Sequence, residues 1–203
     1  MSVSDLIEKL PTYFTISVAS KRNSGKSFLI SCLIRDLIRR KRVDMVLVMS
    51  GSAGLNSDYS FLPKGLVQPF SEPVLKKLWT LQHDTTHTRH ILVVLDDCLS
   101  ERAAIDSKTV HDIFTLGRHL HISCIVASQV ANWLLSPLVK ANSDFILWSK
   151  LNRQQLDTLW TSTSGISKED FMSFSGQGGK DFTFCCLDNY RPVEGSELFL
   201  VKA

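Results

Sequence analysis

The sequence predicts an α/β fold of three layers, in which helices cover both faces of a mainly parallel central sheet of about five core strands, with a C-terminal β-hairpin added. Apolar runs of strand length, typical of strands covered on both faces, lie at residues 13–19, 45–49, 91–97, 122–127 and 144–149. Between them lie segments whose apolar residues recur at helical spacing. Strands that alternate with helices in this way indicate a parallel sheet.

Length and composition agree with one globular domain. The chain has 203 residues, of which 44% are hydrophobic and 21% charged, so it is long enough to bury a core and is not of disordered composition. We expect a single domain over residues 1–203, with a core at 12–150 and a helical and hairpin extension at 151–203. The net charge of +3 is compatible with nucleic-acid binding but does not argue for it.

The cysteines and the N-terminal residues indicate in which cellular compartment the protein is expected. The five cysteines form no CxxC pair, which favours a reducing compartment and argues against a zinc site. The N-terminus lacks the basic flank and long apolar core of a signal peptide, and no apolar run approaches the ~18 residues of a membrane span. We therefore expect an intracellular protein without a direct membrane segment.

The chain begins with a helix predicted over residues 4–10, which Pro11 stops, and continues into the first strand. The next helix is predicted over residues 26–40 and ends in the basic run from Arg39 to Arg42. This run could contact a polyanion. Cations in a last helical turn also complement the helix dipole, however, and we favour that interpretation.

The segment SKRNSGKS, residues 20–27, lies between the first strand and this helix. A tight turn that ends in Gly-Lys-Ser before a helix is the layout of a nucleotide phosphate-binding loop, because helix N-termini favour anions. Gly25 lets the backbone approach a phosphate, Lys26 reaches the β- and γ-phosphates, and the hydroxyl of Ser27 is placed to bind Mg²⁺. The predicted nucleotide-binding residues are Ser20, Lys21, Arg22, Asn23, Ser24, Gly25, Lys26, Ser27 and Phe28.

Ser20 departs from the pattern of such loops. The pattern G-x-x-x-x-G-K-[ST] has glycine at this position. We expect the serine to stiffen the loop or tilt the phosphates, and so to affect the rate of reaction more than the fold.

Residues 50–71 are rich in Gly, Ser, Asn and Pro and are predicted to be irregular, and a helix is predicted over residues 72–82. His83, His87 and His90 follow, at spacings of four and three that would suit a metal site on a helix. Their Thr-rich surroundings favour a solvated loop instead.

Two adjacent acids, Asp96 and Asp97, end the apolar run ILVVLDD. In an open parallel sheet they lie at the edge from which the phosphate loop emerges. Asp96 is placed to hold the Mg²⁺ shell, and Asp97 to orient or deprotonate an attacking water. The alternative is a polar pair that simply ends a strand.

A helix is predicted over residues 106–117, closed by Gly117, and the strand at 122–127 leads to Ser128 and Gln129. A polar side chain at this strand tip can hydrogen-bond the γ-phosphate or the attacking water and so report whether phosphate is present. A short helical piece is predicted over residues 133–139, interrupted at Pro137.

Helices are also predicted at residues 154–160 and 168–174. The Gly-rich segment SGQGGKD, residues 175–181, could be taken for a second phosphate loop, but strand-like FTFCCLD follows it instead of a helix. We therefore predict a hairpin turn there, with residues 197–201 pairing with the strand.

The order of these motifs resembles that of the additional-strand P-loop ATPases, of RecA- and FtsK-like fold, with paired acids after the third strand and a polar Gln after the fourth. The segment GRHLHISCIVASQ, residues 117–129, looks like the GR-x-x-x-IHLI-x-ATQ region of FtsK- and HerA-like DNA-pumping ATPases. It is closer to the GRH-x-x-IS-x-x-x-x-SQ of the poxvirus-type DNA-packaging ATPases of large DNA viruses. The resemblance covers most of residues 13–150.

The resemblance implies an ATPase that uses ATP and Mg²⁺. Lys26 and Ser27 match the phosphate-loop pair of the family. Asp96 matches the metal-associated acid, and Asp97 stands where the family often has Glu as catalytic base. Gln129 matches the polar sensor at the tip of the fourth strand.

The resemblance also implies partners. Arg118 matches an arginine that enters the active site of a neighbouring subunit, and Arg153 is the rival candidate. The implied partners are double-stranded DNA, bound without sequence preference through its phosphates, capsid or portal-vertex proteins, and further copies of the chain in a pentameric or hexameric ring. The implied location is the host cytoplasm or the virus assembly site, with association with the virion.

We therefore expect an ATP-hydrolysing motor that moves double-stranded DNA into a viral capsid. Two alternatives stay open. A small-molecule kinase shares the loop but needs an Arg-rich lid and an acceptor pocket. A non-catalytic nucleotide-binding assembly protein is supported only by Ser20.

Overall fold

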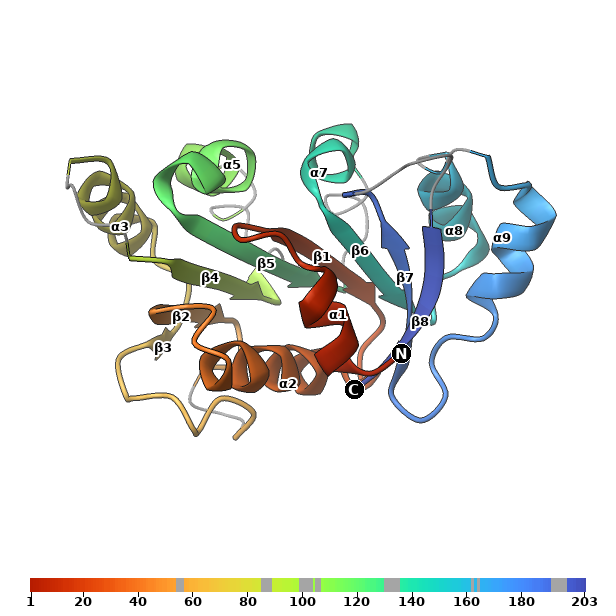
Figure 1. Cartoon of the computed structure of the whole chain (residues 1–203), viewed down its shortest axis with the longest axis horizontal. Helices are drawn as coiled ribbons and strands as arrows, with labels where there is room; N and C mark the ends of the chain where they lie inside the picture. The colour runs from red at the N-terminus through yellow and green to blue at the C-terminus, as the bar shows by residue number, and fades with distance from the viewer. Residues whose placement is uncertain are drawn as a thin grey trace.

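A computed structural model describes residues 1–53, 57–84, 89–98, 104, 107–129, 136–161, 163, 165–190 and 197–203. The strands within this part of the chain are β1 (Thr15–Ser20), β2 (Met45–Ser50), β3 (Val67–Gln68), β4 (Ile91–Asp96), β5 (Ile122–Ser128), β6 (Phe145–Ser149), β7 (Thr183–Asp188) and β8 (Glu197–Lys202). They form one sheet in the order β3-β2-β4-β5-β1-β6-β7-β8 (Figure 1).

Most of the sheet is parallel. Neighbours from β3 to β6 in this order run parallel, whereas β7 pairs antiparallel with β6 and β8 antiparallel with β7. The predicted mainly parallel sheet with a C-terminal hairpin is therefore confirmed, and the hairpin extends the same sheet. The chain leaves the central strand β1 toward β2 on one side and reaches β6 on the other side. Open α/β sheets bind ligands beyond the carboxyl ends of their strands at such a point.

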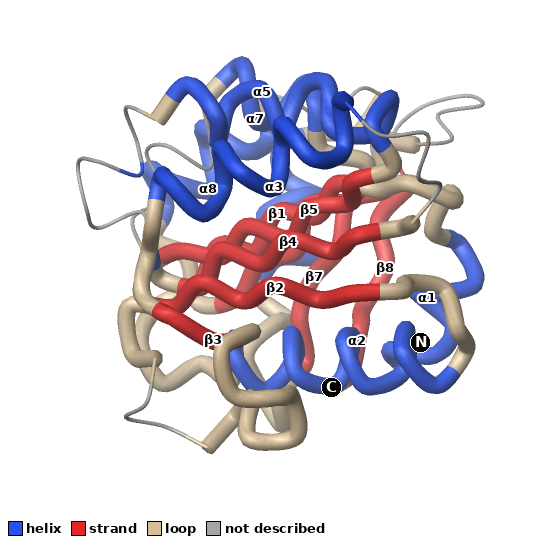
Figure 2. The backbone as a smooth tube through the Cα atoms, turned by 90° about the vertical axis from the view of Figure 1, so that its left-hand side faces the viewer, coloured by secondary structure: helices blue, strands red, loops and turns tan. Residues whose placement is uncertain are grey.

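Helices lie on both faces of the sheet. Within the described residues they are α1 (Val3–Lys9), α2 (Lys26–Arg39), α3 (Glu72–Asp84), α5 (Lys108–Leu116), the 3-10 helix η2 (Gly117–Leu120), α7 (Pro137–Asn142), α8 (Arg153–Trp160) and α9 (Lys168–Ser175). Helices α1 and α2 cover one face, and α3, α5, α7 and α8 cover the other (Figures 1 and 2). This gives the three predicted layers. None of the described helices is long and apolar enough to cross a membrane.

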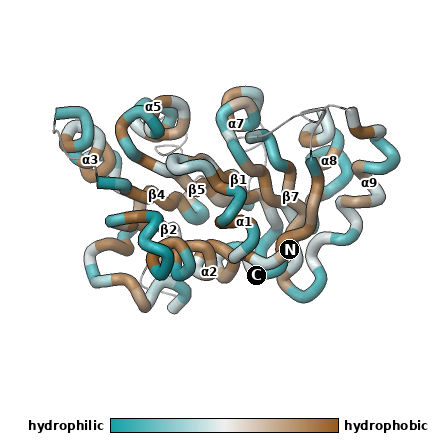
Figure 3. The backbone as a smooth tube through the Cα atoms, viewed as in Figure 1, coloured by the Kyte–Doolittle hydropathy of each residue, from teal (hydrophilic) through white to brown (hydrophobic). Residues whose placement is uncertain are grey.

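Both faces of the central strands are buried, which explains their continuous apolar composition. All residues of β4 are buried. Val93 and Leu95 belong to the hydrophobic cluster beneath α3 and α5, whereas Leu92 and Val94 belong to the cluster beneath α2. Figure 3 shows the same pattern, with the central strands mostly hydrophobic along their length.

The predicted interruption at Pro137 is wrong, because this residue begins α7. Proline is tolerated in a first helical turn, where its missing N–H would have no partner within the helix. The hydroxyl of Ser136 caps the helix by accepting a hydrogen bond from the N–H of Val139. The predicted helical residues 133–135 lie outside the described residues.

The predicted hairpin turn at residues 175–181 is also wrong. This segment connects helix α9 to strand β7, because a helix and not a strand precedes it. The expected strand pairing is confirmed, since β7 and β8 pair antiparallel with Phe184 opposite Val201.

Two predicted boundaries differ from the structure in a smaller way. Gly117 does close α5, but its backbone is right-handed and the chain continues into η2, so that the left-handed residue comes later, at His121 (φ 57°). The stretch predicted to be irregular, residues 50–71, contains the short strand β3, which pairs with β2 at the edge of the sheet.

The basic run at the end of α2 contacts the protein itself. The Arg42 guanidinium donates hydrogen bonds to backbone oxygens at the end of α1 and just beyond it, those of Ile7, Leu10 and Pro11. Arg40 pairs with Asp36 at 3.0 Å and with Glu8 at 3.3 Å. Arg40 and Arg42 are therefore held by groups of the same chain.

Candidate functional site

The predicted phosphate loop lies where the central strand of the sheet meets a helix, since β1 ends at Ser20 and α2 begins at Lys26. Gly25 precedes the helix with a left-handed backbone (φ 84°), and no side chain caps the helix start. A side chain would be strained at this φ, so glycine suits the position. The first N–H groups of a helix have no partner within it and carry its positive dipole end, which favours an anion here.

Ser20 has a structural role in the loop. It is the last residue of β1, lies opposite Ser149 of β6, and is buried. Among the described residues the left-handed positions of the loop are Asn23 (φ 56°) and Gly25, so Ser20 does not need the conformational freedom of glycine. Its hydroxyl is hydrogen-bonded to that of Ser24, which fixes the beginning of the loop to its middle.

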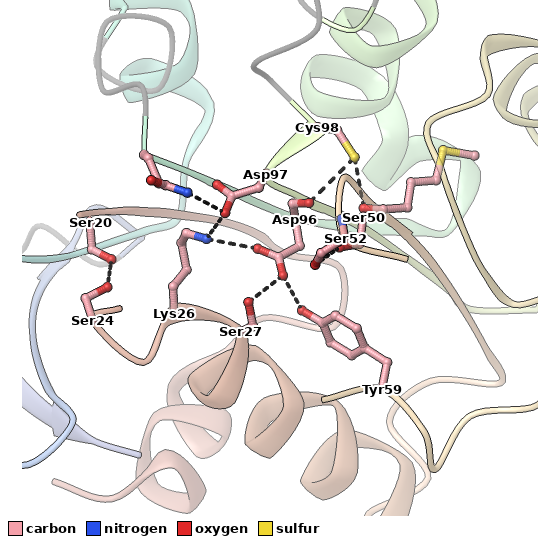
Figure 4. Close-up of polar contacts among 12 residues, drawn as sticks. Ser20, Ser24, Lys26, Ser27, Ser50, Ser52, Tyr59, Asp96, Asp97 and Cys98 are labelled. Carbon is pink, nitrogen blue, oxygen red and sulfur yellow. Dashed lines mark hydrogen bonds and ion pairs between the residues drawn. The ribbon is translucent and has the colours of Figure 1, made fainter. Parts of the chain in front are cut away.

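The paired acids lie at the carboxyl end of β4. Successive residues of a strand point to opposite faces, which would separate the two carboxylates. Asp97 instead has a left-handed backbone (φ 56°), a conformation that Asp adopts more readily than most residues. Both carboxylates therefore reach the phosphate loop, as Figure 4 shows.

Lys26 lies between these two carboxylates. Its Nζ is 3.2 Å from Oδ1 of Asp96 and 2.8 Å from Oδ2 of Asp97. The Lys26 and Asp96 side chains are only 6% and 2% exposed, so water and salt screen their interaction little. Two carboxylates facing one ammonium leave an excess of formal negative charge, which favours a further cation beside Asp96.

Asp96 is held by two hydroxyl groups. Its Oδ2 accepts hydrogen bonds from Oγ of Ser27 at 2.7 Å and from the hydroxyl of Tyr59 at 2.8 Å (Figure 4). Tyr59 is 3% exposed. Burial and the neighbouring charge of Asp96 raise the pKa of Tyr59 above its ordinary value of 10.0, so the phenol keeps its proton and acts as the donor.

Tyr59 is not among the predicted site residues. It belongs to the Gly-, Ser-, Asn- and Pro-rich stretch between β2 and β3, which carries no periodic pattern. One signal in the sequence points to burial of Tyr59, because it is a large aromatic residue in an otherwise polar loop. Nothing in the sequence indicates that its partner is Asp96.

Gln129 lies just beyond β5, next to β4, and its Nε2 donates a 2.9 Å hydrogen bond to Oδ2 of Asp97. The predicted polar strand tip and the predicted water-activating acid are therefore in contact. The site opens into a cavity of about 360 Å³, lined by residues 21–28 together with Ser52, Asp58, Asp97 and Gln129. A cavity of this size is typical of small-molecule sites.

The two arginines considered for a neighbouring subunit's site do not line this cavity. Arg118 lies in η2, just before β5, so it is at the amino-terminal ends of the parallel strands. At about 3.3 Å per residue, β5 separates it by roughly 20 Å from Gln129. Arg153 begins α8 shortly after the end of β6, on the same sheet edge as the phosphate loop.

Arg118 lies close to Asp144. Burial raises the pKa of this carboxyl above its ordinary value, an effect that hydrogen bonds from Thr15 and the charge of Arg118 partly offset. Arg118 and Asp144 also line a small cavity of about 10 Å³ together with Tyr13 and Phe114. Arg118 is itself exposed.

The histidines considered for a metal site are placed apart. His83 lies in the last turn of α3, and His90 is buried before β4, with Nε2 2.7 Å from Oγ of Ser123. His87 lies outside the described residues. Within the described part of the chain, no group of three or more His, Cys, Asp or Glu side chains could hold a metal.

The residues at the loop fit Mg²⁺ and a nucleoside triphosphate. The Ser27 hydroxyl and the Asp96 carboxylate supply the oxygen ligands that Mg²⁺ prefers, and the ion usually takes its other ligands from water and phosphate. Lys26 and the start of α2 supply positive charge for phosphate oxygens. Asp97 and Gln129 both line the cavity and are hydrogen-bonded to each other, so a water could be held beside them.

No protein-family profile matches the chain. The uncharacterized protein 075L of Invertebrate iridescent virus 6 is 26% identical to it over 185 residues, which is 86% of this chain and 70% of that protein. The uncharacterized protein 015R of Frog virus 3 (isolate Goorha) is 25% identical over 156 residues, which is 73% of this chain. The chain spans about half (48%) of the length of the second relative.

Several solved structures are similar over most of the chain. The genome packaging NTPase B204 of Sulfolobus turreted icosahedral virus 2, in complex with ATP-gammaS, aligns with a TM-score of 0.67 at 15% identity, over 93% of this chain and 98% of that one. The pCW3 conjugation coupling protein TcpA aligns with a TM-score of 0.60 at 13% identity, over 93% of this chain and 60% of that one.

The cytoplasmic domain of the Type VII secretion ATPase EccC of Thermomonospora curvata also aligns, with a TM-score of 0.60 at 15% identity, over 95% of this chain and 25% of that one. At such identities these likenesses bear on fold alone. The chain has the α/β fold of the P-loop ATPases.

Proposed function

We propose that the chain hydrolyses ATP to move double-stranded DNA, and that it packages a viral genome into a preformed capsid. One observation supports the ATPase most directly: Lys26 of the phosphate loop contacts both Asp96 and Asp97, beside an uncapped helix start. Groups suited to phosphate, Mg²⁺ and water thus occur in one cluster.

The chemistry follows from these positions. Lys26 would exchange its carboxylate partners for the β- and γ-phosphates, since an ammonium forms charge-assisted hydrogen bonds with both kinds of oxygen. Ser27 and Asp96 would hold Mg²⁺, which neutralises charge on phosphoryl oxygens when bound. Asp97, released from Lys26, would accept a proton from the attacking water, while Gln129 orients that water through its amide.

An oligomeric ring, pentameric or hexameric, follows from the same proposal. About 20 Å of β5 separates Arg118 from the cavity of its own chain, so it would act on a neighbouring subunit. Its exposure at the opposite sheet edge suits such a contact. Arg153 stays the alternative, because it lies near the carboxyl ends of the strands, as the phosphate loop does.

Similarity to other proteins is the basis for three parts of the proposal: the DNA substrate, the capsid or portal-vertex partner and the viral setting. One solved structure of similar fold and nearly the same length is named a genome packaging NTPase, and the two relatives of similar sequence come from viruses. DNA contact would be through phosphates and therefore weakened by salt. The proposed location is the host cytoplasm or virus assembly site, with association with the virion.

Steady-state phosphate release, measured with and without double-stranded DNA, tests this function. We expect release that DNA stimulates and that Lys26→Ala and Asp97→Ala abolish, with Lys77→Ala, an exposed lysine of α3, as the matched control. Transfer of the phosphate to a small molecule instead of water would favour a kinase. Absence of turnover under every condition, with nucleotide still bound, would favour an assembly protein.

A further inference from the structure

Two aromatic side chains from distant parts of the sequence meet beside the phosphate loop. Phe28, in the first turn of α2, and Phe182, just before β7, have ring centroids 5.3 Å apart at an interplanar angle of 49°. The two residues are 45% and 53% exposed. Large aromatic side chains in contact with one another are usually buried. A pair that is exposed to solvent beside a cavity is therefore a candidate ligand-binding surface.

The Phe182 ring lies directly against the loop backbone. A Cβ atom built on Gly25 would be only 2.3 Å from Cδ1 of Phe182, so the ring occupies the space that the missing side chain of the glycine leaves open. Any other residue at position 25 would push this ring away. The close approach therefore depends on glycine for a second reason besides its left-handed φ.

The backbone at Phe182 is held in an uncommon conformation. Asp181 (φ 47°) and Phe182 (φ 56°) are both left-handed, which is a rare state for a bulky aromatic residue. Such positions persist only where the surroundings fix them, and they cluster at ligand sites. Here the result is an aromatic ring placed over the loop with more than half of its residue surface open to solvent.

We propose that Phe182 and Phe28 form a stacking surface for the base of the bound nucleotide; this inference rests on the nucleotide site proposed above. Lys26 and Ser27 fix where the phosphates lie, and Phe28 is both the next residue and part of the cavity lining. The nucleoside end of the ligand then leaves the cavity along this side. An aromatic surface binds the π-face of any base, so it adds affinity with little choice between bases.

Comparison of ADP with pyrophosphate isolates the contribution of this surface to affinity, because the two ligands share a diphosphate and differ by the nucleoside. Affinities of the full chain for both are measured by calorimetry in the presence of Mg²⁺. We expect tighter binding of ADP than of pyrophosphate. Phe182→Ala should weaken ADP binding about 5- to 150-fold, as loss of base stacking does, with pyrophosphate binding changed by less than about twofold.

Three further variants keep the test interpretable. Phe182→Trp retains an aromatic ring and should keep the preference for ADP, whereas Phe182→Leu retains bulk without the ring and should lose it. Ile38→Ala removes a similarly exposed apolar side chain from the other end of α2 and should change neither affinity. GDP and CDP should bind within a few-fold of ADP.

Different results would overturn the stacking surface and the phosphate site. Equal loss of ADP and pyrophosphate binding in Phe182→Ala, or no loss of either, overturns the stacking surface and leaves the phosphate site standing. Failure of the unmodified chain to bind either ligand, or binding that Lys26→Ala leaves unchanged, overturns the phosphate site and the stacking surface with it.

Discussion

The hydroxyl of Tyr59 donates a 2.8 Å hydrogen bond to Oδ2 of Asp96, and both side chains are almost completely buried. The bond joins an irregular connection between β2 and β3 to the carboxyl end of β4. It leaves Oδ1 of Asp96 to Lys26 at 3.2 Å. A residue of no predicted role therefore fixes the orientation of the acid that we propose binds Mg²⁺.

Tyr59→Phe tests this relationship. The change removes a hydrogen bond to a charged group in a buried site, and such bonds contribute about 1.5–3 kcal/mol. We expect the free energy of unfolding, from urea titration, to fall by about that amount and Mg²⁺-dependent hydrolysis to fall with it. Tyr13→Phe, which keeps the ring that stacks on His121, is the matched control. Unchanged stability and hydrolysis in Tyr59→Phe would mean that Asp96 needs no such support.

Asp97→Asn separates water activation from binding. The amide keeps the shape of the side chain but cannot accept a proton, and a positioned general base contributes about 10²- to 10⁴-fold in rate. We expect phosphate release to fall by a factor in this range, while the affinity for ADP stays within a few-fold. Asp84→Asn, at the exposed end of α3, serves as control. If the Asp97 variant hydrolyses ATP at the original rate, another group activates the water.

Arg118 can be tested by mixing variants. An arginine that acts on a neighbouring subunit can be worth ~10³ to 10⁵ in rate, so we expect Arg118→Ala to be nearly inactive alone. A mixture with Lys26→Ala should recover part of the phosphate release, because some interfaces then combine an intact loop with an intact arginine. The same experiment with Arg153→Ala distinguishes the two candidates. A strict monomer in solution with bound nucleotide would exclude both.

Ser20→Gly restores the usual loop pattern but removes a partner from the buried hydroxyl of Ser24. Loss of a partner for a buried polar group costs about 1–3 kcal/mol. We therefore expect lower stability in urea titration and a hydrolysis rate within a few-fold of the original. Ser20→Ala should cost as much stability, since it too removes the hydroxyl. A collapse of hydrolysis in Ser20→Gly alone would show that the loop needs the stiffness of serine.

His90 gives the chain a predictable response to acid. Burial lowers its pKa below the ordinary value of 6.5, against the opposing effect of a hydrogen bond to the Arg42 backbone. As pH falls below about 6.5, the unfolded chain takes up a proton that the folded chain resists, so stability falls with pH in that window. Urea midpoints between pH 7.5 and pH 5 measure the slope. His90→Gln should reduce it, and an unchanged slope would assign the effect to other groups.

Local patterns in the sequence were sufficient to identify the parallel strands and the phosphate loop. Continuous apolar runs identified the parallel strands, because both faces of such strands are covered. Gly25, Lys26 and Ser27 between a strand and a helix identified the loop, and Asp96 and Asp97 at a strand end identified the acidic groups that contact it. These signals are local, since periodicity and capping depend on neighbouring residues alone.

The distant residues that complete the site could be identified only from the folded chain. Tyr59 reaches Asp96 from a connection without periodic pattern, and Phe182 reaches Gly25 from the start of a strand-like segment, so no local signal could assign either contact. The left-handed backbone of Asp97, which brings both acids to Lys26, is likewise set by the packing at the strand end. The physical reason is the same throughout: such contacts depend on how the sheet orders its strands, and that order brings together residues that the sequence keeps apart.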